Sequence, residues 1–222
     1  MKLALLLPGY LDSPDYLHMK IFDKRLSELG YTVERLDPCN LWQDGDIGNY
    51  TITNYIKQIK NLVDSYIDKN PEEIVLIGHS LGAFVSIIAG NRIKAVTKIV
   101  ALCPAGDRIS IALNWEAKKF RHSLRELPYD PGQSRTFDIP DTFAKDGLQY
   151  SALEEVKEIK KPIMIFIALD DKTIPPEDSE RVVANANDPY TIRQPNIGHD
   201  FRKSEDECNI VMDHIEKFLE IS

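Results

Sequence analysis

The chain contains one serine whose neighbours are spaced for nucleophilic catalysis. Gly78, Ser80 and Gly82 form the pattern G-x-S-x-G, with branched apolar residues before it and a helix-compatible run after it. In a strand–turn–helix context the serine hydroxyl is pushed above the sheet, because small residues on either side let strand and helix approach closely. The amide of Leu81, at the helix start, can stabilise an oxyanion at the same place. A chance glycine–serine turn is the alternative, and the flanking elements favour the nucleophile.

A serine hydroxyl is a weak nucleophile without a general base, and the base is expected to be a histidine oriented by a carboxylate. In a parallel sheet these partners should lie just past the carboxyl ends of strands. His199 follows the last predicted strand, and Gly198 allows the loop to bend towards the serine. Asp170 and Asp171 directly follow the strand before it. Adjacent side chains of an extended segment point to opposite sides, so only one of these carboxylates can face the histidine.

The other four histidines have structural interpretations. His18 and His122 fall in stretches predicted to be helical and exposed, and His214 lies in the last predicted helix. His79 is adjacent to the serine, so the backbone turns its ring away from the hydroxyl, and we expect it to pack under the turn. His199 is favoured as the base because its place after a strand and its preceding glycine agree.

An oxyanion hole needs a second backbone N–H besides that of Leu81, and the loop after the first strand can supply it. Gly9 permits a close approach of the backbone, which makes the amide of Tyr10 the candidate. The alternative is that Pro8–Gly9 is only a sharp turn. If the first strand lies between the second and the third, the loops after the first and third strands line the crevice in which ligands bind. Tyr10 would then face Ser80.

Strands and helices alternate along the rest of the chain. Apolar runs predict six strands, at residues 3–7, 32–36, 74–77, 98–102, 163–169 and 191–194. Helical periodicity predicts helices over about 16–29, 52–67, 83–89, 153–159, 176–186 and 204–219, the last beginning with the capping-box spacing of Ser204 and Glu207. This alternation predicts a single α/β domain over residues 1–222, with a mostly parallel six-stranded sheet and helices on both faces.

Residues 106–150 interrupt this rhythm. They combine aromatic residues with many charges and several prolines, and one helix is predicted near residues 115–127. Long irregular insertions in a regular pattern are often functional, so we expect a cap over the active site, with Trp115 and Phe143 lining the substrate pocket. The alternative is a solvated connector anchored by a few aromatic side chains.

The composition limits the classes of partner. The formal net charge is −8 over 222 residues without a basic cluster, so neither nucleic acid nor an anionic membrane is an expected partner. Cys39, Cys103 and Cys208 form no metal-binding or disulfide pattern, which fits a reducing cytoplasm. The apolar run Leu3–Leu7 is too short for a signal peptide, and no segment is long enough to span a bilayer. The sequence leaves the oligomeric state open.

Four segments together resemble the α/β-hydrolase superfamily, namely Leu7–Tyr10, Gly78–Gly82, Asp170–Pro175 and Gly198–Asp200. They occur in the family's order and span nearly the whole chain. The resemblance implies a small single-domain member of the superfamily whose sheet has the strand order 2-1-3-4-5-6. The sequence differs in the oxyanion loop, where family members often carry His-Gly and this chain has Pro8–Gly9.

The resemblance also assigns roles to residues. The family's acid usually stands four residues before a proline that follows a branched apolar residue, and Pro175 in that position selects Asp171 over Asp170. The implied catalytic triad is Ser80, Asp171 and His199, which requires neither a metal nor an organic cofactor.

The expected reaction is hydrolysis of a small-molecule carboxylic ester, with a small to medium acyl chain, through an acyl-enzyme intermediate. Thioester or amide hydrolysis could use the same residues, and the sequence does not separate these substrates. A second class of function is a non-catalytic binding protein that retains the hydrolase fold. The complete set of catalytic residue types argues against that second class.

Overall fold

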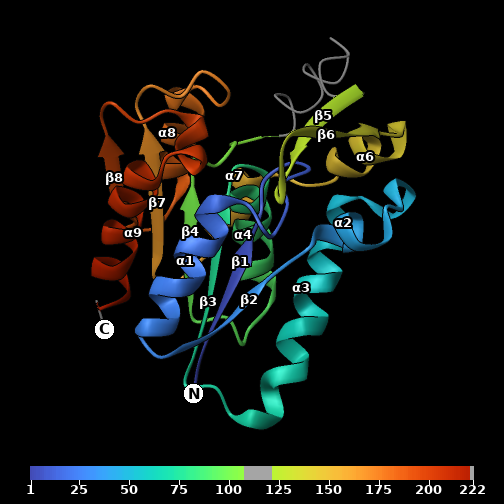
Figure 1. Ribbon diagram of the computed structural model, residues 1–222. Helices are drawn as coiled ribbons and strands as arrows, with labels where there is room; N and C mark the ends of the chain where they lie inside the picture. Colours follow the sequence, from blue (N-terminus) through green and yellow to red (C-terminus); the bar gives the residue numbers. More distant parts are fainter. Residues whose placement is uncertain (108–121, 221–222) are drawn as a thin grey trace.

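Six parallel strands form the centre of the protein. The computed structural model describes residues 1–107 and 122–220, and its main sheet has the strand order β2-β1-β3-β4-β7-β8 (Figure 1). This order confirms the predicted one, because β7 and β8 are the fifth and sixth strands of this sheet along the chain. The strands are β1 (Lys2–Leu7), β2 (Tyr31–Arg35), β3 (Glu73–His79), β4 (Lys98–Leu102), β7 (Ile163–Ala168) and β8 (Tyr190–Gln194).

Helices connect these strands. Six of the described helices lie close to the predicted ranges, whereas the short helices at Leu41–Asp44 and Asp141–Gly147 were not predicted. The hydroxyl of Ser204 accepts a hydrogen bond from the N–H of Glu207 at 3.3 Å, which confirms the predicted cap of the last helix. The helices are α1 (Leu17–Glu28), α2 (Leu41–Asp44), α3 (Ile52–Tyr66), α4 (Leu81–Arg92), α6 (Asp141–Gly147), α7 (Ala152–Lys157), α8 (Pro176–Asn185) and α9 (Glu205–Leu219).

The helices cover both faces of the sheet (Figure 1). Successive residues of a strand point to opposite faces, so the apolar run of β1 serves two cores. Leu3, Leu5 and Leu7 belong to the cluster formed with α3, α4 and α7, whereas Ala4 and Leu6 belong to the cluster formed with α1 and α9. The central strand β3 is thus buried on both sides, which holds the turn at its carboxyl end in a fixed place.

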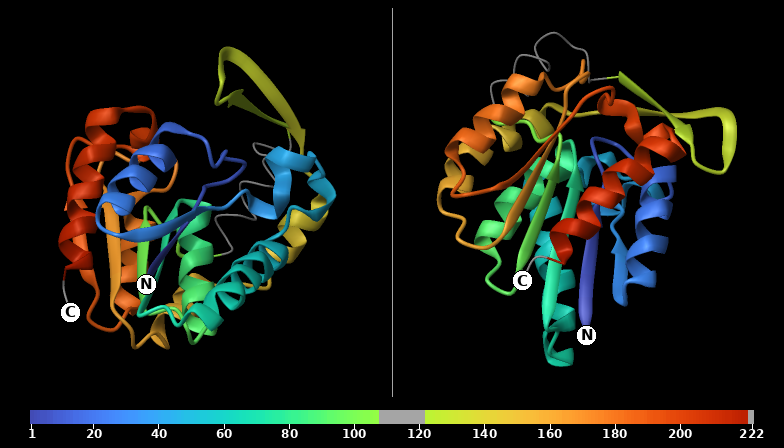
Figure 2. Two further views of the ribbon diagram at one scale, coloured as in Figure 1. Left: turned by 60° about the horizontal axis from the view of Figure 1, so that its bottom comes forward. Right: turned by 90° about the vertical axis from the view of Figure 1, so that its left-hand side faces the viewer.

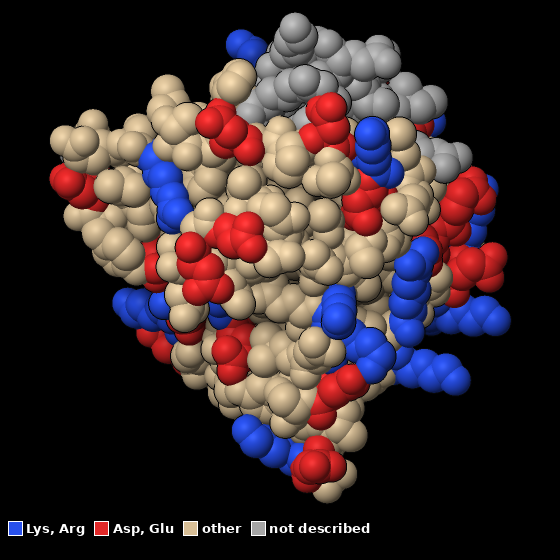
Figure 3. All heavy atoms as spheres, turned by 90° about the vertical axis from the view of Figure 1, so that its right-hand side faces the viewer, with Lys and Arg blue, Asp and Glu red and all other residues tan. Residues whose placement is uncertain are grey.

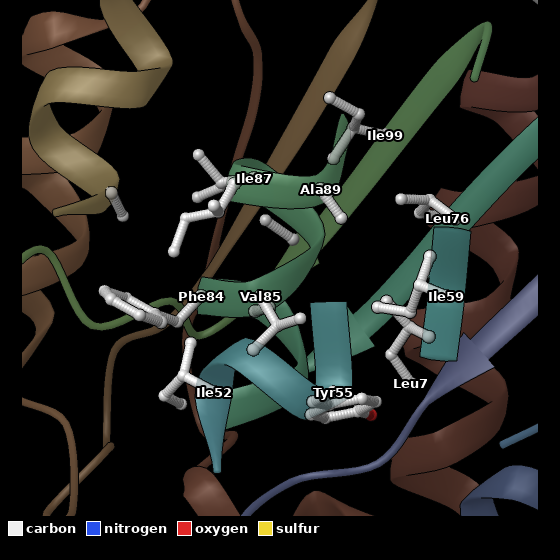
Figure 4. Packing of buried hydrophobic residues seen from close by; sticks show 14 of the residues in the cluster. Leu7, Ile52, Tyr55, Ile59, Leu76, Phe84, Val85, Ile87, Ala89 and Ile99 are labelled. Carbon is white, nitrogen blue, oxygen red and sulfur yellow. The ribbon is translucent and has the colours of Figure 1, made fainter. Parts of the chain in front are cut away.

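Helix α4, which follows that turn, is apolar on nearly every side because it lies between the sheet and other helices. Its residues from Gly82 to Gly90 are all buried. Phe84 and Val85 pack against Ile52 and Tyr55 of α3 (Figure 4). A helix that is apolar all round is a buried helix, so α4 is anchored by packing rather than by its own amphipathic pattern.

The insertion between β4 and β7 contains an antiparallel hairpin, formed by β5 (His122–Leu127) and β6 (Asp130–Asp138), which projects from the body of the protein (Figure 2). The helix predicted over residues 115–127 is therefore wrong for residues 122–127, and residues 115–121 lie outside the described part. Residues 122–127 form a strand because their burial alternates with a period of two. Ser123 is buried and Arg125 half-buried, whereas the residues between and beside them are exposed.

The surface carries charges of both signs. On the face in Figure 3, the basic and acidic side chains of the described residues are interspersed and form no extended patch of one sign. Within residues 1–107 and 122–220, no helix combines the length and the apolar character that crossing a bilayer requires.

Candidate active site

Ser80 occupies a strained turn between β3 and α4. Its backbone has φ 56° and ψ −116°, a conformation that residues with a side chain rarely adopt and that costs about 1–3 kcal/mol. The N–H of Ser80 donates to the carbonyl of Leu102 at 2.9 Å, and its carbonyl accepts from the N–H of Phe84 at 3.0 Å. The neighbouring strand and the following helix therefore hold the strained conformation from both sides.

The two glycines of the motif allow the close approaches that this turn requires. A Cβ atom on Gly78 would lie 2.1 Å from the carbonyl oxygen of Gly82. A Cβ atom on Gly82 would lie 2.0 Å from the carbonyl oxygen of Leu7 in β1. Both partners are backbone atoms that cannot move aside, so the spacing of the motif has a direct steric cause.

The structure brings Ser80, His199 and Asp171 into one hydrogen-bonded chain. Nε2 of His199 lies 3.0 Å from Oγ of Ser80, and its Nδ1 lies 2.7 Å from Oδ2 of Asp171. Oδ1 of Asp171 accepts the N–H groups of Thr173 and Ile174, each at 2.8 Å. The carboxylate is thus fixed by backbone donors on one oxygen and presents the other to the imidazole.

Asp170 occupies a different environment from its neighbour. Asp170 is exposed to solvent, whereas Asp171 is only 6 % exposed. The N–H of Asp170 donates to the carbonyl of Ile197 at 3.0 Å, and a Cβ on Gly198 would lie 3.2 Å from the Asp170 carbonyl oxygen. The backbone of Asp170 therefore supports the loop that carries His199.

The loop after β1 lies against the serine turn. A Cβ atom on Gly9 would approach the Cβ of Ser80 to 3.4 Å, so the Gly9–Tyr10 peptide is adjacent to the nucleophile candidate. The carbonyl of Gly9 accepts the N–H of Asp12 at 3.1 Å, which forms a tight turn. On the other side of the site, Leu81 is the first residue of α4, a position whose N–H has no acceptor within its own helix.

Aromatic side chains connect this loop to the insertion. The ring of Tyr10 lies 5.3 Å from that of Phe143 on α6, and Phe143 stacks on Tyr50 at 5.3 Å. Burial raises the pKa of the Tyr10 phenol, which is therefore neutral at physiological pH. Phe143 itself is only 4 % exposed. Trp115, the other predicted pocket residue, lies outside the described residues.

Two buried histidines lie beneath the site. His79 packs under the turn as predicted, with its ring 4.8 Å from that of His199. His18, predicted to be exposed, is instead fully buried against His79 and Phe22, because it lies on the inner face of α1. Neither ring nitrogen of His18 has a hydrogen-bond partner in the described part of the chain. His122 is exposed, but on strand β5 rather than on a helix.

Burial also determines how these two rings titrate. Desolvation lowers the pKa of His18 to about 3 and lowers the pKa of His79 well below its ordinary value. Both imidazoles are therefore neutral at physiological pH.

Asp12 is a buried acidic residue that no sequence motif marks, and it was not among the predicted site residues. Arg202 lies 3.2 Å and Arg125 lies 3.8 Å from Oδ1 of Asp12. Donor atoms of Asp12, His18 and His79 lie within 4.8 Å of one another, a spacing that could hold a metal ion. A divalent cation there would stand beside two guanidinium groups, and this repulsion makes the cluster a poor metal site.

Nucleophile elbows above a parallel sheet are characteristic of the α/β hydrolases, and the turn at Ser80 places this protein in that class. The particular family follows from its sequence. The chain belongs to the Alpha/beta hydrolase family, whose model matches residues 4–207. Among curated protein sequences, none matches the chain significantly.

Solved structures share the fold along nearly the whole chain. Est1E from Butyrivibrio proteoclasticus with bound ferulic acid is 18 % identical, with a TM-score of 0.74 over 99 % of this chain and 89 % of its own. Alpha/beta hydrolase domain-containing protein 10 from mouse is 19 % identical, with a TM-score of 0.74 over 98 % and 89 %. The esterase domain of a Rhodothermus marinus protein is 16 % identical, with a TM-score of 0.71 over 98 % and 85 %. At these identities the likeness concerns the fold.

Proposed function

We propose that the protein hydrolyses carboxylic esters with small to medium acyl chains through an acyl-enzyme intermediate. The observation that carries this proposal is the position of His199, whose two ring nitrogens contact Ser80 at 3.0 Å and Asp171 at 2.7 Å. A histidine bridging a serine hydroxyl and a buried carboxylate is the arrangement that activates serine as a nucleophile.

In the proposed reaction, Nε2 of His199 takes the proton of Ser80 as Oγ attacks the ester carbonyl. The backbone N–H groups of Leu81 and Tyr10 stabilise the negative charge that develops on the carbonyl oxygen. His199 then gives its proton to the leaving alcohol. A water molecule, deprotonated by the same nitrogen, then attacks the acyl carbon, and His199 returns the proton to Oγ of Ser80 as the bond between Oγ and the acyl carbon breaks and the acid leaves. All catalytic groups belong to the protein, and water is the only reactant besides the ester, so the proposed mechanism requires no cofactor and no metal.

Asp171 has the role of orienting the base. With Nδ1–H donated to Oδ2 of Asp171, the imidazole presents its unprotonated Nε2 to the serine. When His199 takes up the proton, the carboxylate stabilises the imidazolium that forms. The two backbone donors on Oδ1 hold the carboxylate in this orientation.

The proposed substrate is a small-molecule ester, and the insertion limits its size. Two of the structural neighbours support the ester class by their names: Est1E holds ferulic acid, a carboxylic acid, and the Rhodothermus marinus domain is an esterase. We assign the acyl pocket to the insertion over residues 106–150, with Trp115 and Phe143 as lining residues. Phe143 contacts the ring of Tyr10, so this side of the pocket adjoins the oxyanion loop.

Two measurements test this proposal. A fluorophosphonate probe should label the wild-type protein at Ser80, and p-nitrophenyl esters of graded chain length should be hydrolysed fastest at short to medium chains. Ser80→Ala should remain folded by circular dichroism, lose labelling and lose turnover by on the order of 10⁴-fold or more. If a folded Ser80→Ala protein keeps most of the wild-type turnover, Ser80 is not the nucleophile. If wild type neither reacts nor hydrolyses any ester, the protein is a binder that retains the fold.

A further inference from the structure

One peptide group of the loop after β1 is held on both of its sides by side chains from distant parts of the chain. The carbonyl of Tyr10 accepts two hydrogen bonds from the guanidinium of Arg125, from Nη2 at 2.9 Å and from Nε at 3.3 Å. The N–H of Leu11, in the same peptide group, donates to the hydroxyl of Tyr50 at 2.9 Å. A peptide group is planar, so these contacts together fix the rotation of the Tyr10–Leu11 plane.

The preceding peptide group carries the proposed oxyanion donor. Its carbonyl, that of Gly9, accepts the N–H of Asp12, so the N–H of Tyr10 points to the opposite side of the same trans plane. The two planes meet at the Cα of Tyr10, and the orientation of one limits that of the other. Leu11 has φ 56°, a left-handed conformation that non-glycine residues keep only where their surroundings hold it.

The hairpin holds Tyr10 through two residues on one face of β5. Ser123 and Arg125 are two positions apart on a strand, so both side chains point to the body of the protein. The side chain of Ser123 is hydrogen-bonded to the Tyr10 phenol, and the Arg125 guanidinium lies 5.8 Å from the centre of the Tyr10 ring. Arg125 also forms an ion pair with the buried carboxylate of Asp12, at 3.8 Å.

We propose that Arg125 and Tyr50 are positioning residues that aim the Tyr10 N–H at the reacting carbonyl oxygen. The inference rests on the proposed ester hydrolysis and extends it, because it gives hairpin β5–β6 a part in transition-state stabilisation. Neither residue touches the substrate in this mechanism. Their loss should lower kcat more than it raises KM, since a displaced donor weakens the transition state selectively.

The first test compares two arginines of the same hairpin. Arg125 and Arg135 are cross-strand partners, but Arg135 donates to the carbonyl of Trp42 at 3.2 Å. Arg125→Met, which keeps a stem of similar length and removes the donors, should lower kcat by about 10- to 100-fold with KM changed less than about 3-fold. The matched control Arg135→Met should keep kcat within about 3-fold of wild type.

A second readout separates oxyanion positioning from a general disturbance of the cap. Sulfur accepts hydrogen bonds more weakly than oxygen, so an intact oxyanion hole favours an oxoester over its thionoester analogue. The ratio of the two kcat values should fall in Arg125→Met and stay at the wild-type value in Arg135→Met. A lowered kcat with an unchanged ratio would place the effect of Arg125 elsewhere and overturn the proposal.

Two conservative variants complete the test. Arg125→Lys still presents one donor to the Tyr10 carbonyl, and it should recover part of the kcat that Arg125→Met loses. Tyr50→Phe removes the acceptor of the Leu11 N–H and should lower both kcat, by about 10-fold, and the oxoester-to-thionoester ratio. If the wild-type enzyme is active and folded Arg125→Met and Tyr50→Phe keep its kcat and its oxoester-to-thionoester ratio, the inference about positioning is overturned while the proposed function stands. An inactive wild type would overturn the proposed function itself.

Discussion

Asp170 and Asp171 are adjacent in the sequence but lie in very different surroundings. Asp171 is buried, receives two backbone N–H donors and contacts His199, whereas Asp170 is exposed. An acid can orient a histidine only from a fixed position within hydrogen-bond distance. In the proposed mechanism the two residues therefore differ greatly in their effect on turnover.

We expect Asp171→Asn to lower kcat by roughly 10⁴-fold, since the amide keeps the shape but no longer stabilises the imidazolium or holds the required tautomer. Asp170→Asn is the matched control and should change kcat by less than about 3-fold, because only its backbone contacts the loop of His199. The measurement is kcat of both variants on one activated ester, with folding checked by circular dichroism. A larger loss in Asp170→Asn than in Asp171→Asn would contradict the assignment.

Residue types with a spacing rule could be placed from the sequence, and residues without one could not. The G-x-S-x-G pattern located the turn at Ser80, and the strand ends located the loops of His199 and Asp171. The burial of His18 was missed because polarity alone indicates an exposed position. Its place four residues before Phe22, a spacing that puts both on one helix face, was the available signal. Arg125 and Asp12 had no signal, since their pairing depends on the fold.

At the scale of elements, the junction of β1, β3 and α4 leaves no room for a methyl group at Gly82. Gly82→Ala should lower the free energy of unfolding by about 1–3 kcal/mol, because the new Cβ would stand 2.0 Å from a carbonyl oxygen of β1. Gly90→Ala, in the same helix, meets side-chain atoms of Ile99 at 2.3 Å and 2.6 Å rather than backbone atoms. It should cost less, since a side chain can shift where a carbonyl of the sheet cannot and alanine also favours the helix. Urea denaturation of both variants measures the difference. Equal losses of unfolding free energy in the two variants would show that the junction of β1, β3 and α4 is no more closely packed than the site of Gly90.

The main sheet was predictable because its elements have strong periods, and the insertion was not. A buried parallel strand such as β3 is a continuous apolar run, and amphipathic helices such as α3 have a clear stripe. In β5 the inward residues Ser123 and Arg125 are polar, so apolar periodicity gave no sign of a strand. Its pairing with β6 and its contacts with Tyr10 determine its structure.

At the scale of the whole molecule, the two buried histidines link stability to pH. His18, which faces His79 and lies near Asp12 and Arg202, has its pKa lowered to about 3, whereas in the unfolded chain it titrates near 6.5. Between these pH values the unfolded state binds a proton that the native state does not, so stability falls as the pH falls. One such residue costs about 2 kcal/mol at pH 5 relative to neutral pH.

His18→Leu should therefore lose less stability between pH 7 and pH 5 than the wild type, whatever its stability at pH 7. Free energies of unfolding from urea titrations at both pH values give the comparison. The same loss in His18→Leu as in wild type would mean that His18 is accessible to protons in the native state.

The order of strands across the sheet has a consequence for refolding. Ser80 and His199 are separated by 119 positions, and the loop of His199 follows β8, which joins the sheet only through β7. We expect contacts between such distant segments to form late, because closing the long loop between them costs conformational entropy. A refolding molecule can thus regain the helices and inner strands of the sheet while Ser80 still lacks its base. The rate at which ester hydrolysis recovers would then report the docking of β8, so the proposed activity measures the last step of refolding.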